Sequence, residues 1–131
     1  MRRLIGLAVL QLASAGVHAC LFATSTPPEG WYQWAANGLF AGDVTAVGKD
    51  ETKPVDVITV RVVETFKGAD ATNGTLTVRV PRRNWNACKL EVPATGARVL
   101  VAMNANSEVM LVPLSASYTE ELRKIRGQVH N

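Results

Sequence analysis

The stretch VDVITVRVVETF, residues 55–66, decides the fold because it carries the clearest period-two pattern in the chain. This pattern is typical of a β-strand that buries one of its two faces. Glu64 interrupts the apolar face near its end. Alternate positions are apolar on one side and polar on the other: Ile58, Val60, Val62 and Phe66 against Thr59, Arg61 and Thr65.

Four more segments predict short strands, which gives five in all. They are residues 39–47, 75–80, 97–103 and 108–112. In the first of them Gly42 predicts a bulge or a bend in the sheet. The segment ARVLVAM, residues 97–103, is apolar on both faces, as expected of a strand that is covered on both sides. A polar loop with Trp85 and Cys88 is predicted just before it.

Two helices complete the expected domain. Residues 29–37 follow Pro27-Pro28 and place Trp31 and Trp34 on one face, where we expect them to pack against the sheet. Ser117 and Glu120 have the spacing of a capping box at the start of a last helix, which would bury Leu122 and Ile125. The sequence therefore predicts a mostly β fold, a five-stranded OB-like Greek-key barrel with a short N-terminal helix and a C-terminal helix.

The first nineteen residues have the pattern of a signal peptide. Arg2 and Arg3 precede an apolar run at residues 4–13, and small residues come after it. Cleavage after Ala19 would leave Cys20 first, and cleavage after Ala15 is the alternative. We therefore expect a signal peptide at residues 1–19 and a single secreted or periplasmic domain at residues 20–131.

Removal of residues 1–19 takes away two of the 14 basic residues, which leaves 12 against 11 acidic ones and a net charge of +1. The basic doublet Arg82-Arg83 has no aromatic residues interleaved with it, and we expect a solvated loop there. The sequence thus predicts that nucleic acid is not a partner of this chain. Beyond the signal peptide, no apolar run reaches the length of a transmembrane helix.

The two cysteines, Cys20 and Cys88, favour one disulfide, because exported proteins with an even number of cysteines usually pair them. A bridge that closes the chain between Cys20 and Cys88 into a loop would stabilise the fold by roughly 4 kcal/mol on the chain-entropy model. The alternative is a lipid anchor on Cys20, since Val17-His18-Ala19-Cys20 loosely matches a lipidation site. The two modifications exclude each other at the Cys20 sulfur.

The sequence predicts neither a catalytic site nor a metal or other cofactor. The only histidines are His18, in the signal peptide, and His130, in the C-terminal tail. They form no cluster with metal-ligand spacing and no arrangement with a nucleophile. We expect a non-enzymatic protein.

Taken in order, four passages give the chain a family resemblance: Cys20 followed by Pro27-Pro28; the strand Leu39-Phe40-Ala41-Gly42-Asp43-Val44; the strand end Val63-Glu64-Thr65-Phe66-Lys67-Gly68; and Cys88 before Gly96-Ala97-Arg98-Val99-Leu100-Val101-Ala102. In this order the chain resembles the N-terminal, netrin-like domain of tissue inhibitors of metalloproteinases (TIMPs), and the bacterial exported proteins similar to them. The resemblance covers about residues 20–127.

The resemblance implies an OB-like barrel and a bridge from Cys20 to Cys88. A second bridge of the family is missing, because Phe22 and Leu114 stand where its cysteines would be. We expect an apolar contact between these two residues in its place.

The resemblance also implies a function. In the animal inhibitors the N-terminal cysteine chelates the catalytic zinc of the protease through its α-amino group and carbonyl oxygen. Here that role would fall to Cys20, with Leu21 entering the pocket beside the zinc and with Phe22 and Ala23 flanking it. The expected partner is a zinc metalloprotease. The alternative is a binding or structural module of the cell envelope, with or without a lipid on Cys20, that has no protease target.

Overall fold

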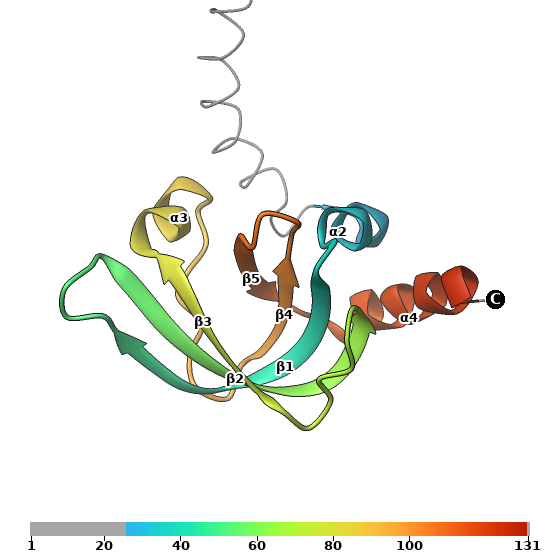
Figure 1. The fold of residues 1–131 in the computed structure, drawn as a ribbon, viewed down its shortest axis with the longest axis horizontal. Coiled ribbons are helices and arrows are strands. Elements are labelled where there is room, and N and C mark those ends of the chain that lie inside the picture. Colours follow the sequence, from blue (N-terminus) through green and yellow to red (C-terminus); the bar gives the residue numbers. More distant parts are fainter. Residues whose placement is uncertain (1–25, 131) are drawn as a thin grey trace, which may run out of the picture.

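The computed structural model describes residues 26–130, which form one curved β-sheet with helices packed around it (Figure 1). The predicted mostly β fold, with five strands, a short first helix and a C-terminal helix, is confirmed. The elements of the described part are α2 (Pro28–Trp34), β1 (Gly38–Lys49), β2 (Val55–Lys67), β3 (Thr75–Pro81), α3 (Arg82–Ala87), β4 (Arg98–Met103), β5 (Val109–Pro113) and α4 (Ala116–His130).

All neighbouring strands are antiparallel, and their order in the sheet is β3-β2-β1-β4-β5. Strands β1 to β3 follow one another as hairpins, and β4 returns to lie beside β1, which is the Greek-key order. The two edge strands, β3 and β5, approach each other. No ladder joins them in the described part of the chain, so the sheet is open there.

Bulges bend the long β1–β2 pair. Opposite Ala41 and Gly42 the register skips Val63, so the bulge that we predicted at Gly42 is present, with the extra residue on the partner strand. A second skip leaves out Phe66. The extra residues change which side chains face which side of β2. Phe66 therefore does not share the face of Ile58, as its spacing predicts, but packs on the opposite one.

The sheet buries apolar side chains on both of its faces. Strand β4 is therefore covered on both sides, as predicted. Val99 and Val101 face one way, and Leu100 and Ala102 face the other. We call the first group the inner cluster, which lies within the curve of the sheet: Phe40, Val44, Ile58, Val60, Val62, Val78, Val80, Trp85, Val99, Val101 and Leu111. The second is the helix cluster: Trp31, Tyr32, Ala35, Leu39, Ala41, Phe66, Leu100, Ala102, Met110, Val112, Leu114 and Leu122.

The last helix covers the helix cluster and starts earlier than we predicted. Leu122 is fully buried and Ile125 packs beside it, as expected. However, Ser115 rather than Ser117 caps the helix, since the Ser115 hydroxyl accepts a hydrogen bond from the Tyr118 N–H at 3.2 Å. Both serines stand before the apolar face of the helix in the sequence, and only the backbone of the structure shows which of them caps the helix.

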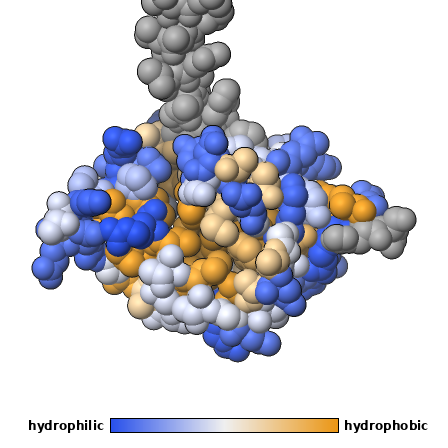
Figure 2. Space-filling model, viewed as in Figure 1, coloured by the Kyte–Doolittle hydropathy of each residue, from blue (hydrophilic) through white to orange (hydrophobic). Residues whose placement is uncertain are grey.

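Residues 82–87 form the short helix α3 where we predicted a loop. Trp85 is its buried residue and belongs to the inner cluster. Figure 2 shows apolar residues across the middle of the face between α3 and α2, with polar residues around them. Within the described residues, no helix is both long and apolar enough to span a membrane.

Candidate functional site

The residues that we predicted to contact a protease lie just before the described part of the chain. Cys20, Leu21, Phe22 and Ala23 are all outside residues 26–130, and so is the predicted signal peptide. The described chain begins shortly after them, at Thr26. It also contains Cys88 and Leu114, the two residues whose side chains we predicted to meet this leading segment.

Three elements lie together along one edge of the molecule in Figure 1. They are α3, the turn Asn104–Glu108 between β4 and β5, and α2, at whose start the described chain begins. We call this the helical edge.

Thr26 is held firmly at the helical edge. It is 6% exposed, and its carbonyl oxygen accepts a hydrogen bond from the hydroxyl of Tyr118 on α4. Burial, followed by the nearby charge of Glu29, raises the pKa of this hydroxyl, which keeps it a hydrogen-bond donor at neutral pH. Pro27 then turns the chain into α2 in an extended conformation. The start of α2 is therefore tied to α4.

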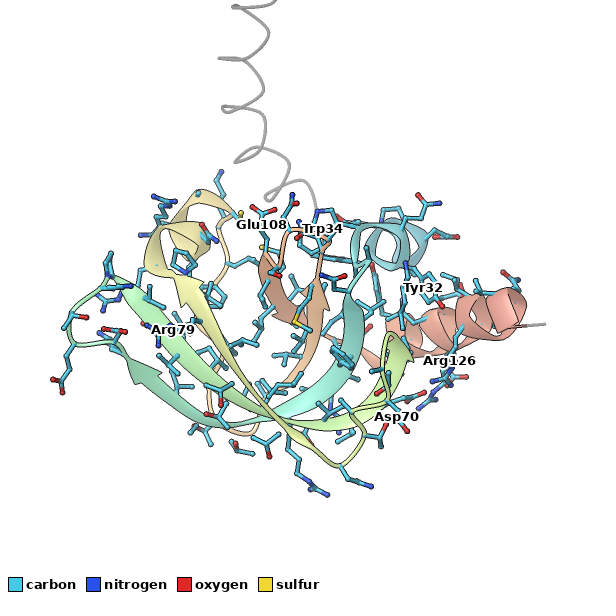
Figure 3. The ribbon with its side chains drawn as sticks, in the orientation of Figure 1. Tyr32, Trp34, Asp70, Arg79, Glu108 and Arg126 are labelled. Carbon is cyan, nitrogen blue, oxygen red and sulfur yellow. The ribbon has the colours of Figure 1, made fainter. Side chains whose placement is uncertain are left out.

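The tryptophans of α2 pack into the fold, as their spacing predicts. Trp31 is 1% exposed, and its ring meets that of Trp34 edge to face, with the centroids 5.7 Å apart. Figure 3 shows Trp34 and Glu108 both at the helical edge, and Glu108 lies at the end of the β4–β5 turn. That turn is ordered by Asn104, whose side-chain oxygen accepts hydrogen bonds from the N–H groups of Asn106 and Glu108, both at 2.9 Å.

Cys88 and Leu114 both pack with the helix cluster. Cys88 is the residue after α3 and is half-buried against the cluster. Leu114 is 9% exposed and belongs to the cluster itself. Next to it is an apolar pocket of about 310 Å³, which shares Tyr118 with the anchor of Thr26. The pocket is lined by Trp31, Val112, Pro113, Leu114, Ser115 and Tyr118. The predicted partners Cys20 and Phe22 are outside the described residues, so both pairings stay predictions.

A larger groove of about 690 Å³ opens beside the end of β2. Figure 3 shows Tyr32, Asp70 and Arg126 around this end of the strand. The cations that line the groove already have partners within the fold. Lys67 donates to the carbonyl oxygen of Tyr32 at 2.7 Å and lies 4.9 Å from the centre of its ring. Arg126 donates to the carbonyl oxygen of Thr65 at 2.8 Å. We therefore assign these cations to holding α2 and α4 on the sheet.

Glu64, which interrupts the apolar pattern of β2, is the centre of an ion-pair network with α4. Arg123 donates to its two carboxylate oxygens at 2.8 and 2.9 Å, and Arg126 lies 3.1 Å from one of them. Hydrogen bonds from Arg123 are the main cause that lowers the pKa of Glu64 below its usual value, against the opposing effect of burial.

We expect Glu64→Gln to lower the free energy of unfolding at pH 7 by about 1–2 kcal/mol, since it removes the charge from a bidentate pair. A carboxylate with a lowered pKa stabilises the fold above its unfolded pKa, and this contribution is lost as the pH falls through the folded value. The difference between the two proteins should therefore shrink below about pH 4.5, the usual pKa of glutamate. Urea unfolding from pH 7 to pH 3 measures it.

The matched control is Glu121→Gln. Glu121 is exposed on the same helix and lies 3.5 Å from Lys124. Exposed pairs of this kind contribute little, so this change should leave stability nearly unaltered at every pH. Equal effects of the two substitutions would contradict the assigned role of Glu64.

Groups that could bind a metal ion do not gather in the described part of the chain. Among residues 26–130, no three histidine, cysteine, aspartate or glutamate side chains are close enough to hold a metal ion. What the structure does show at the helical edge is the bond that ties Thr26, the first described residue, to α4.

Comparison with protein-family models found no match to this chain, and comparison with curated proteins found no significant match.

Proposed function

We propose that the exported chain inhibits a zinc metalloprotease through its first mature residue. In this proposal the signal peptide is removed after Ala19, and the free α-amino group and carbonyl oxygen of Cys20 chelate the zinc of the target enzyme. The catalytic zinc of such enzymes keeps one coordination position open for substrate or water, which an incoming ligand can occupy. An α-amino group has a pKa near 8, so a useful fraction is uncharged and able to bind metal at neutral pH.

The observation that carries the proposal is the anchoring of Thr26. This residue is buried and bonded to Tyr118, and it stands six positions after Cys20. Six residues span at most about 20 Å, so in a mature chain that begins at Cys20 the first residue stays within about 20 Å of Thr26. A fixed attachment point supports inhibition, because it restricts the conformations open to the preceding residues and so reduces the conformational entropy lost on binding.

The location of Cys88 gives further support. It packs with the same helix cluster as Tyr118 and Leu114, next to the edge at which the leading segment arrives. We propose that a Cys20–Cys88 disulfide holds the chelating residue and that Phe22 fills the pocket beside Leu114. We propose further that Leu21 enters the pocket of the protease beside the zinc and that Ala23 flanks it.

The proposal is tested by assays of the mature protein against a panel of zinc metalloproteases. We expect inhibition of at least one of them, and we expect Leu21→Ala to weaken it by about tenfold or more, the loss expected when a leucine no longer fills an apolar pocket. Val47→Ala is the control, because Val47 is 41% exposed near the tip of the β1–β2 hairpin, far from α2 in Figure 1. Failure to inhibit any member, or an equal loss with both substitutions, would count against the proposal.

A further inference from the structure

A buried carboxylate on β2 holds the helix that leads to Cys88. Asp56 is 3% exposed and has the same strand parity as Ile58 and Val60, whose side chains fill the inner cluster. A charged group in such a position is costly unless hydrogen bonds compensate it. Its partners both come from α3: the indole N–H of Trp85 donates to Oδ2 at 2.9 Å, and Nε of Arg82 lies 3.4 Å from Oδ1.

Helix α3 has few other means of keeping its orientation. It has only six residues, and no side chain caps its first turn. Trp85 is its one buried residue among those that the structure describes in this helix. Its start is joined to the sheet by the bond from the Arg82 N–H to the Pro54 carbonyl, at 2.9 Å. The bond between Trp85 and Asp56 is thus a second point of attachment, which fixes the rotation of the helix.

The rotation of α3 decides where Cys88 lies. Cys88 is the C-cap, and its N–H donates to the carbonyl of Asn84 at 3.1 Å. The next residue, Lys89, has a φ of 56°, and Leu90 donates back to the carbonyl of Trp85 at 2.8 Å. These bonds make Cys88 move with α3. Disulfide geometry is demanding, because the two α-carbons must lie about 4.4–6.8 Å apart.

We propose that Asp56 is a positioning residue that orients Cys88, through Trp85 and α3, for its bridge to Cys20. The inference rests on the bridge in the proposed function, but not on inhibition. Bridge formation is a balanced exchange with oxidised glutathione: the two thiols lose two protons and two electrons, and one glutathione disulfide becomes two glutathione thiols. The equilibrium constant of this exchange measures how well the fold presents the two sulfurs to each other.

The test uses the mature protein, reduced and then equilibrated in glutathione buffers, with the bridged fraction measured by alkylation and mass spectrometry. We expect Trp85→Phe, which keeps an aromatic ring but removes the indole N–H, to lower the equilibrium constant by about tenfold. Asp56→Ala should lower it at least as much. Asp56→Asn keeps an acceptor for Trp85 and should lie nearer to the wild type.

Glu64→Gln is the control, because it alters an ion pair with α4 near the opposite end of β2. It should reduce stability without changing the equilibrium constant of the folded protein more than about twofold. If Asp56→Ala does not fold, Trp85→Phe and Asp56→Asn still decide the question. Values for Trp85→Phe equal to those of the control would overturn the inference. A protein that bridges in this Asp56-dependent way but inhibits no protease would retain the inference and refute the proposed function.

Discussion

A mature protein that carries one extra alanine before Cys20 is expected to lose inhibition by about 100-fold or more, as when a hot-spot group is removed from an interface. The added residue turns the α-amine of Cys20 into an amide nitrogen, whose lone pair is delocalised and does not bind zinc at neutral pH. It also moves the free amine one residue, roughly 3.5 Å, away from the point fixed by the fold.

The matched control for this experiment is one alanine added after Asn131, at the other end of the chain. It has the same mass and composition, so any difference reports the position of the residue. Circular dichroism and urea unfolding should find both extended proteins folded, because neither change touches residues 26–130. Equal inhibition by the two proteins would eliminate chelation by the N-terminal amine.

Replacing Gly42 by alanine is expected to lower the free energy of unfolding by about 1–3 kcal/mol, the usual cost of overpacking a well-packed site. A Cβ at this position would stand 2.3 Å from Cγ1 of Val60 and 2.7 Å from the carbonyl oxygen of Arg61. The second contact is with backbone, so the bulged β1–β2 pair would have to move. Urea unfolding followed by tryptophan fluorescence measures the loss.

Gly48 provides the control on the same strand, since a Cβ there would meet nothing within 4 Å. Gly48→Ala should leave stability unchanged or raise it by roughly 0.5 kcal/mol, because alanine has less conformational freedom to lose on folding. If Gly42→Ala were tolerated as well as Gly48→Ala, the close approach of β1 and β2 at the bulge would be wrong.

Most of the strands could be predicted from a period of two that is long enough to be seen, and residues 97–103 from a short apolar run. The bulges could not, and the first of them explains the misplacement of Phe66: the extra residue Val63 reverses the parity of the part of β2 that follows it. Helix α3 was missed because six residues give less than two turns, too few for a helical period to appear. Its orientation comes from a contact with Asp56, 29 positions from Trp85 in the sequence.

Two acidic residues of β2 indicate ion pairs that we did not predict from the sequence. Asp56 and Glu64 both occupy apolar-face positions of residues 55–66, where a carboxylate needs a partner from elsewhere in the chain. That pattern indicates a buried or half-buried ion pair on each of them. It does not identify Trp85 or Arg123 as the partners, since these come from helices that the sequence does not place relative to β2.

The predicted site itself depends on covalent chemistry at the start of the mature chain. The fold fixes Thr26, Cys88 and Leu114, and the chelating role of Cys20 applies only if the chain is cut before that residue. The most direct measurement is the intact mass of the exported protein, with its N-terminal residue identified by fragmentation. We predict the mass of residues 20–131 less two hydrogens, as expected for one disulfide. A first residue other than Cys20, an added lipid on its sulfur, or the mass of two free thiols would contradict it.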